Sequence, residues 1–273
     1  MKKQLFVSLA LAGVLFVPVI TRAQFANGVI SYNSGTGFVA GFTNPATALG
    51  APSQVTPGDF GGPVDPFNPP FLSSQVVSLG AGGSLTLQLD RPIQNNPSNP
   101  FGIDFILFGN TGFQITNDFD LDTFTFVGTP ATDGSLFGNN TGSTRVEVSA
   151  DGINWFTLNP ALAPTVDGLF PTVGSGNPLI PVDPALNSDN FSGQTLAGIE
   201  SRYGGSAGGT GFSLAWAQDN FGNSTNLAFA DFVRIDVISG TSEIDAISVV
   251  PEPATGALAL AGAGFFWIQR RKR

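Results

Sequence analysis

The chain has 273 residues with neither cysteine nor histidine, and its formal net charge is −9. The absence of these two residue types excludes disulfide scaffolds, Ser-His and Cys-His nucleophiles, and zinc sites built from imidazole or thiolate. The chemistry that stays open rests on carboxylates, either as an acid pair that cleaves glycans or as ligands of a hard metal ion.

Residues 1–23 have the order of a secretory signal peptide. Two lysines precede an apolar run from Leu5 to Val17, and residues 21–23 offer a cleavage site for signal peptidase. Pro18 interrupts the run before it reaches the roughly 20 apolar residues of a membrane span. We therefore expect an exported protein whose mature chain begins at Gln24.

Residues 250–273 form a three-part tail. Pro251, Glu252 and Pro253 precede an uncharged stretch up to Ile268, and a basic cluster follows, made of Arg270, Arg271, Lys272 and Arg273. Such a cluster stops translocation and stays on the cytoplasmic side. Because the apolar stretch is short and rich in small residues, we expect a single-helix anchor that is transient or processed.

This tail resembles the PEP-CTERM sorting signal of bacteria that produce exopolysaccharide, and Val250-Pro251-Glu252-Pro253-Ala254-Thr255 matches its core. The resemblance implies recognition by an exosortase, which cuts near the motif and releases or re-attaches the protein outside. A destination at the cell surface or in the extracellular matrix follows from it.

Residues 24–249, the expected ectodomain, carry four arginines and no lysine against nineteen carboxylates, a formal charge of −15. Such a surface repels nucleic acid and anionic lipid, and it favours cations or neutral partners. The same charge also serves solubility in a crowded matrix. At this length one domain can bury a core without disulfides.

Short apolar runs separated by glycine-rich turns indicate an all-β protein, and no stretch keeps a helical period. Two segments rich in Gly and Pro, 52–70 and 160–190, read as long loops. We predict an antiparallel β-sandwich of the jelly-roll type. The expected strands are 75–79, 84–89, 103–108, 123–127, 145–149, 155–158, 232–237 and 244–249.

The predicted core takes residues two apart on these strands, because such residues share a face. Ile244 and Ile247 are three apart, so a regular strand would bury only one of them. The predicted core residues are Leu85, Leu87, Phe105, Leu107, Val146, Val148, Val233, Ile235, Ile244 and Ile247.

Several ectodomain segments resemble PEP-CTERM surface proteins with a galactose-binding-like jelly-roll domain, among them 44–50, 102–110, 146–155 and 243–247. In the final strand of several carbohydrate-binding jelly rolls an aspartate holds a structural Ca²⁺, which the resemblance assigns to Asp245. Asp104, in a similar setting, is either its partner or an edge residue. This chain has Ser213 where such domains often have aspartate, a departure from that ligand pattern.

Asp118, Asp120 and Asp122 alternate along the chain, which would place them on one side of an extended strand. There they could converge on Ca²⁺ or face water, and a solvated strand face is the favoured interpretation. They do not form an EF-hand loop, because the sixth position is Thr123 and the twelfth is Thr129.

Sugar rings stack on exposed aromatic side chains, and the polar-headed Trp and Tyr suit a wet surface better than Phe. Tyr203, expected in a flexible glycine-rich loop, and Trp155, expected near a strand start after a hairpin turn, are the candidates. For Trp155, packing against the sandwich is the alternative.

The favoured function is a non-catalytic surface or matrix protein that binds polysaccharide or serves as a matrix or adhesion component. The alternative is a carboxylate-dependent enzyme that cleaves glycans, which would need two acids about 5 to 9.5 Å apart in a cleft.

Overall fold

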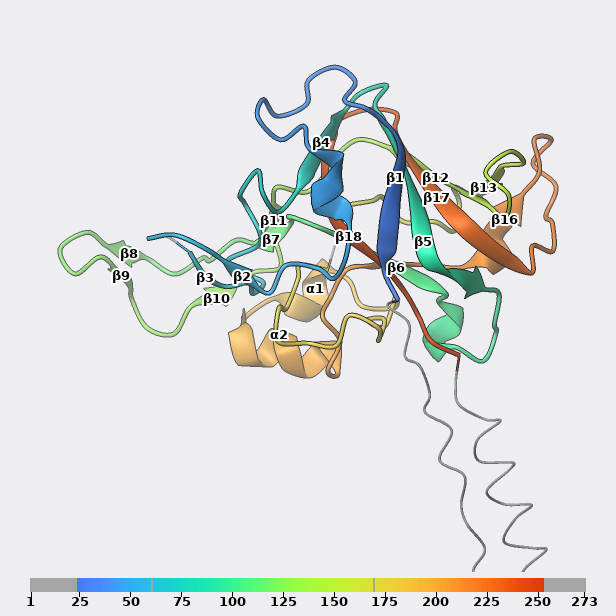
Figure 1. The fold of residues 1–273 in the computed structure, drawn as a ribbon. Coiled ribbons are helices and arrows are strands. Elements are labelled where there is room, and N and C mark those ends of the chain that lie inside the picture. Colours follow the sequence, from blue (N-terminus) through green and yellow to red (C-terminus); the bar gives the residue numbers. More distant parts are fainter. Residues whose placement is uncertain (1–23, 60, 169, 253–273) are drawn as a thin grey trace, which may run out of the picture.

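A computed structural model describes residues 24–59, 61–168 and 170–252, and within them two antiparallel sheets pack face to face (Figure 1). The larger sheet has the strand order β1 (Ala26–Asn33), β5 (Ser84–Gln94), β17 (Phe229–Val237), β12 (Thr144–Ser149), β13 (Phe156–Leu158) and β16 (Ala217–Gln218). The smaller sheet has the order β15 (Thr210–Phe212), β6 (Phe105–Gly109), β18 (Thr241–Val249) and β4 (Val77–Gly80). The predicted antiparallel β-sandwich is confirmed.

Shorter elements join these strands. Four two-stranded pairs are β2 (Val55–Thr56) with β3 (Gly62–Pro63), β7 (Gly112–Phe113) with β11 (Leu136–Phe137), β8 (Phe119–Asp120) with β9 (Thr125–Phe126), and β10 (Ala131–Thr132) with β14 (Gln194–Thr195). The helices are α1 (Ser188–Phe191) and α2 (Leu196–Tyr203), with 3₁₀ turns at Pro45–Ala48, Pro100–Gly102 and Leu214–Trp216.

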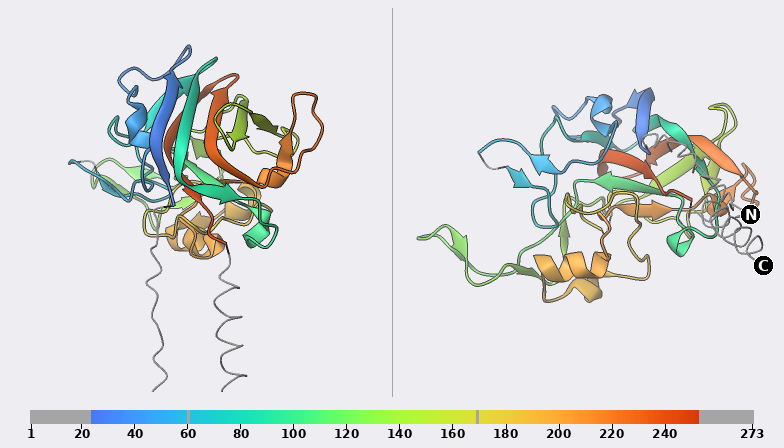
Figure 2. Two further views of the ribbon diagram at one scale, coloured as in Figure 1. Left: turned by 45° about the vertical axis from the view of Figure 1, so that its right-hand side comes forward. Right: turned by 60° about the horizontal axis from the view of Figure 1, so that its bottom comes forward.

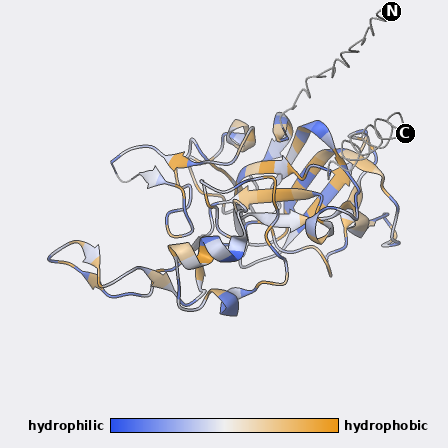
Figure 3. Ribbon diagram, turned by 90° about the horizontal axis from the view of Figure 1, so that it is seen from below, coloured by the Kyte–Doolittle hydropathy of each residue, from blue (hydrophilic) through white to orange (hydrophobic). Residues whose placement is uncertain are grey.

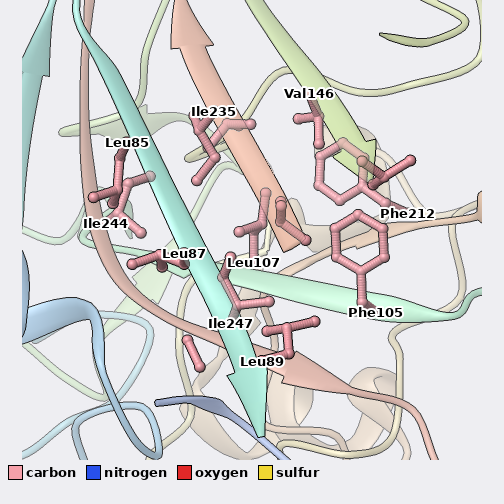
Figure 4. Close-up of a cluster of buried hydrophobic side chains, with 14 of the residues drawn as sticks. Leu85, Leu87, Leu89, Phe105, Leu107, Val146, Phe212, Ile235, Ile244 and Ile247 are labelled. Carbon is pink, nitrogen blue, oxygen red and sulfur yellow. The ribbon is translucent and has the colours of Figure 1, made fainter. Parts of the chain in front are cut away.

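The main core lies between the two sheets, where alternate residues of facing strands interdigitate (Figure 4). All ten predicted core residues are buried, at 2% exposure or less. Phe105 of β6 stacks on Phe212 of β15 with ring centroids 5.4 Å apart. Truncating one such large side chain to alanine costs about 2–5 kcal/mol of stability.

Both Ile244 and Ile247 enter the main core, which a regular strand would not allow. The pairing of β18 with β6 shifts register between Ile244 and Ala246. A bulge of this kind inserts one extra residue and changes which side chains face the core. Ala246 packs in a second cluster with Ile106 and Phe108, on the other face of the smaller sheet.

The segment 160–190 is not a free loop, because part of it is buried. Val173 and Val182 pack with Phe191 of α1 and Ile199 of α2 in a third cluster. Figure 2 shows these helices lying together at one end of the sandwich. Figure 3 shows hydrophobic and hydrophilic residues alternating along the strands, the pattern of an element with one buried face.

The two ends of the described chain meet at one end of the sandwich. The Val249 amide donates to the Gln24 carbonyl at 2.7 Å, and the Val250 amide donates to the Asp104 carbonyl at 2.9 Å. Pro251 and Glu252 therefore follow directly on the last hydrogen-bonded residues of β18. No helix in the described ranges is both long and apolar enough to cross a bilayer.

Two local predictions differ from the structure. The edge strand β1 lies outside the predicted strands, because Gly28 interrupts its apolar pattern and its register shifts twice against β5. The predicted strand 123–127 shrinks to β9, which pairs only with β8 in a hairpin that projects from the sandwich (Figure 1).

Candidate functional site

Two hairpin tips lie side by side next to β13 and β16, on the side of the sandwich away from the β8–β9 hairpin (Figure 1). The first tip connects β12 to β13, where the Asp151 carboxylate accepts the Ile153 and Asn154 amides, both at 2.8 Å. Gly152 has φ +71°, a left-handed conformation that glycine adopts without cost. This Asp-Gly turn places Trp155 directly before the first residue of β13.

The second tip follows β16 and is closed by Asp219. Its carboxylate accepts the Phe221 and Asn223 amides at 2.9 Å and the Asn223 side-chain amide at 3.1 Å. These hydrogen bonds, those from Asn223 foremost, lower the pKa of Asp219. Those from Asn154 and Ile153 lower the pKa of Asp151 in the same way. Both tips are therefore held by ionised carboxylates.

A pocket of about 300 Å³ lies between the tips, lined by Ile153, Asn154, Trp155, Phe156, Asp219 and Asn220. Ile153 is 79% exposed, and Phe221 on the second tip is 89% exposed. Pockets of this size are at the lower end for ligand sites and suit about one sugar ring. Apolar rims around amide and carboxylate groups provide the contacts that sugars need, stacking and hydrogen bonds.

Arg234 of β17 fixes the indole of Trp155 from the sheet side, with its guanidinium carbon 4.5 Å from the ring centroid. Arg234 is held in turn by the Glu147 carboxylate, which accepts from its Nε at 2.6 Å. Thr157 donates to the other Glu147 oxygen at 3.2 Å. The half-buried tryptophan thus rests on a preformed ion-pair network and does not need to reorganise on binding.

The smaller sheet carries a second polar pocket of about 290 Å³, lined by Val39, Asn110, Gly138, Asn139, Asn140, Thr141, Thr241 and Glu243. Glu243 is 8% exposed and accepts a hydrogen bond from the Asn110 side chain. Beneath it, Asp167 accepts the Glu243 amide at 3.0 Å and the Thr111 hydroxyl at 2.8 Å. The buried side-chain amide oxygen of Asn110, Oδ1, has no hydrogen-bond partner among the described residues.

Burial and the neighbouring Asp167 raise the pKa of Glu243 to about 7, and burial raises the pKa of Asp167 to about 6. Only Glu243 lines the pocket, while the Asp167 side chain lies beneath it. A glycosidase needs two acids that flank the substrate. Glu243 therefore provides one proton donor in this pocket, and the pocket lining has, among the described residues, no second carboxylate across from it.

Asp245, the predicted calcium ligand, is 2% exposed and contacts Ser53. Its carboxylate accepts the Ser53 amide at 2.7 Å and the Ser53 hydroxyl at 2.9 Å. Calcium takes six to eight oxygen ligands. Within residues 24–252, leaving out 60 and 169, no three acidic, histidine or cysteine side chains converge on a common metal position. Ser53 supplies the hydrogen bonds to this carboxylate among the described residues, and the calcium role of Asp245 stays a prediction.

Asp104, its proposed partner, lies at the opposite end of β6, where its carboxylate accepts four hydrogen bonds. The donors are the Asn96 amide, the Asn99 side chain, the Ser213 hydroxyl and the Leu214 amide, at 2.8 to 3.2 Å. Ser213 is thus a hydrogen-bond donor to this carboxylate. The carboxylate is satisfied by the protein alone, and Asp104 and Asp245 do not meet.

Asp118, Asp120 and Asp122 do not share one side of a strand, so that expectation is wrong. The chain turns after Asp120, whose carboxylate accepts the amides of Asp122 at 2.8 Å and Thr123 at 3.3 Å. The turn arises because an aspartate side chain can bond to the backbone two residues on. Asp122 therefore lies in the turn, and the Asp120 carboxylate closes the turn of the β8–β9 hairpin.

Tyr203 is not in an exposed loop, which corrects the second prediction for a sugar-stacking residue. It ends α2, is 3% exposed and packs edge-on against Phe170 and Phe191, with centroids 6.1 and 5.9 Å apart. Gly204 has φ +60° and ends the helix as a left-handed cap. The glycine pair after Tyr203 is a helix stop signal.

The sequence interpretation missed Asp219, Asn220, Asp167 and Glu243. Asp219-Asn220-Phe221-Gly222-Asn223 was a readable turn signal of Asp, Asn and Gly. Asp167 and Glu243 are 76 residues apart and meet only in the fold.

Of the sorting residues, Pro251 and Glu252 are partly to fully exposed directly after β18, whereas Pro253 and the basic cluster 270–273 lie outside the described residues, as does the predicted signal peptide 1–23. No curated protein matches the sequence. Residues 249–273 match the family model of the PEP-CTERM protein-sorting motif. The chain thus carries a PEP-CTERM sorting tail at its C-terminal end and is an exported protein that is anchored transiently in the membrane and sorted by an exosortase.

Proposed function

We propose that the sandwich domain is a non-catalytic module that binds extracellular polysaccharide through the Trp155 pocket. The observation that carries the proposal is a half-buried tryptophan, fixed by Arg234, in a sugar-sized pocket with Asn154, Asp219 and Asn220. The tail resembles the sorting signal of bacteria that produce exopolysaccharide. A protein exported by such a cell meets polysaccharide at the cell surface. Cell surface and matrix are its proposed destinations.

A glycan array with the ectodomain, residues 24–252, tests this proposal. Trp155→Ala removes the stacking ring and should reduce binding about tenfold or more, since aromatic contacts contribute roughly 0.5–1.5 kcal/mol beyond buried area. Phe124→Ala is the matched control, because Phe124 is a 77% exposed aromatic on the distant β8–β9 hairpin. Equal loss in both variants would indicate nonspecific adhesion and reject the pocket.

The second candidate is glycan cleavage, and the raised pKa of Glu243 in a polar pocket is the observation that favours it. A carboxylic acid that stays protonated near neutral pH can serve as a general acid. Release of reducing ends from glycans bound on the array, lost in Glu243→Gln, would establish this activity. Glycan binding without release of reducing ends would favour the non-catalytic binding module over a glycan-cleaving enzyme.

A further inference from the structure

The charges around the Trp155 pocket restrict the class of sugar that it can take. Its lining includes one carboxylate, Asp219, and no cationic side chain. Both arginines on the neighbouring sheet face are paired, Arg234 with Glu147 and Arg145 with Asp236, the latter at 2.7 Å. Together with Asp151 on the first tip, these groups are two arginines and four carboxylates.

Acidic glycans are polyanions, and proteins recognise them with arginines that are free to form bidentate pairs with carboxylate or sulfate. If Arg234 left Glu147 to meet a ligand, that carboxylate, whose side chain is 10% exposed, would keep only the Thr157 hydroxyl at 3.2 Å and Arg145 at 3.8 Å. Weakening the pairing of a buried charge is costly. The network beneath Trp155 therefore disfavours an anionic ligand.

A cationic sugar would find one carboxylate in the pocket lining, Asp219, and three acceptor positions of that carboxylate are taken by its own loop. Its two oxygens already accept from Phe221 and Asn223. The groups left for a ligand are the indole of Trp155, the side-chain amides of Asn154 and Asn220, and the exposed apolar rim. These groups stack on a ring and exchange hydrogen bonds with hydroxyls.

We infer that the Trp155 pocket binds an uncharged sugar unit of a neutral polysaccharide and rejects uronate-containing and sulfated polymers. The inference rests on the proposed function, since it names the ligand class of the same pocket. Its consequence is a selective attachment to the neutral components of a mixed matrix, with little dependence on ionic strength.

The test measures binding of the ectodomain, residues 24–252, to dextran, galactan, galactomannan and xyloglucan, and to polygalacturonate and heparin. Each is measured at about 20 and about 500 mM NaCl, because salt screens charge-driven contacts but not stacking. We expect at least one neutral polymer to bind, with less than about a twofold change in affinity between the two salt concentrations. Trp155→Ala should weaken that binding about tenfold, and Phe124→Ala should not change it.

The outcomes separate the inference from the proposed function. Binding of polygalacturonate or heparin that is tighter than binding of any neutral polymer, and that needs Trp155, would overturn the inference and keep the pocket as a glycan site. Binding of no polymer at either salt concentration would overturn both. Neutral binding that Trp155→Ala leaves intact would place the site elsewhere.

Discussion

Two groups of carboxylates, one at the Trp155 pocket and one beside β18, form no ion pair with an arginine among the described residues. Their pKa values are nevertheless shifted in opposite directions. Asp151 and Asp219 are exposed in hairpin tips, and backbone amides lower their pKa values. Asp167, Glu243 and Asp245 are buried, and desolvation raises their pKa values to about 6 or 7. The first group organises a surface pocket while charged, whereas burial shifts the second group toward the neutral form relative to the unfolded chain.

The largest effect is expected at Gly109, where β6 passes close to the buried carboxylates Asp167 and Glu243. A methyl group at this position would overlap the Asp167 carboxylate and lie 2.7 Å from the Glu243 carbonyl oxygen. We expect Gly109→Ala to lower the free energy of unfolding by about 3 kcal/mol through overpacking. Urea unfolding measures this effect. Gly28→Ala is the control, because its methyl group would meet Gln88 at an ordinary 3.5 Å. Equal stability of the two variants would contradict the close packing of Asp167.

The buried group should make the protein more stable in mild acid than at neutral pH. The pKa of Asp245 is about 7 in the fold, against about 4 for an unfolded aspartate. Its stabilising contribution is thus fully present below pH about 4 and is lost as the pH rises through 7. The Asp167 and Glu243 pKa values are raised in the same direction.

Asp245→Asn mimics the neutral carboxyl, so it should remove a few kcal/mol of this pH dependence and be more stable than the original chain at pH 8. Thermal melts between pH 4 and pH 8 test this. In the same experiment, the Tm of the original chain and of Asp245→Asn is also measured with calcium and with a chelator. A calcium-dependent rise in Tm that Asp245→Asn lacks would support the calcium role that the family resemblance implies, and it would contradict a purely hydrogen-bonded role for Asp245 beside Ser53.

The exposed group should affect binding instead of folding. Asp219→Ala removes the acceptor that closes the second tip, so Asn220 would lose its fixed position in the pocket. We expect glycan affinity to fall about threefold to tenfold, by the loss of preorganisation, with Tm unchanged within error. Asp133→Ala is the control, since Asp133 is a comparable turn aspartate that accepts the Ser135 amide far from the pocket. A similar loss in both variants would argue against preorganisation by Asp219.

The smallest effect is expected at the tail. The last backbone hydrogen bond described at this end is that of Val250, so a chain ending at Glu252 should keep the Tm and glycan affinity of the longer chain. We also expect mature protein from the cell surface to end near Glu252. Intact-mass analysis checks this, and retention of residues 270–273 in most molecules would reject it.

Sequence alone indicated the sorting tail, the antiparallel sandwich and all ten core residues tested, because these features depend on local order and on period-two burial. The place of Trp155 next to a strand start was also readable from the sequence, since Asp151-Gly152 favours a turn just before it. Tyr203 shows the limit, because burial of an aromatic ring depends on Phe170 and Phe191, which only folding brings to α2. The bulge in β18, the Asp167–Glu243 pair and the pairing of Asp245 with Ser53 join residues from distant segments, and no sequence period records such contacts. Tertiary structure thus decided that Asp167, Glu243 and Asp245 became buried with raised pKa values, and that Asp151 and Asp219 stayed in surface turns with lowered ones.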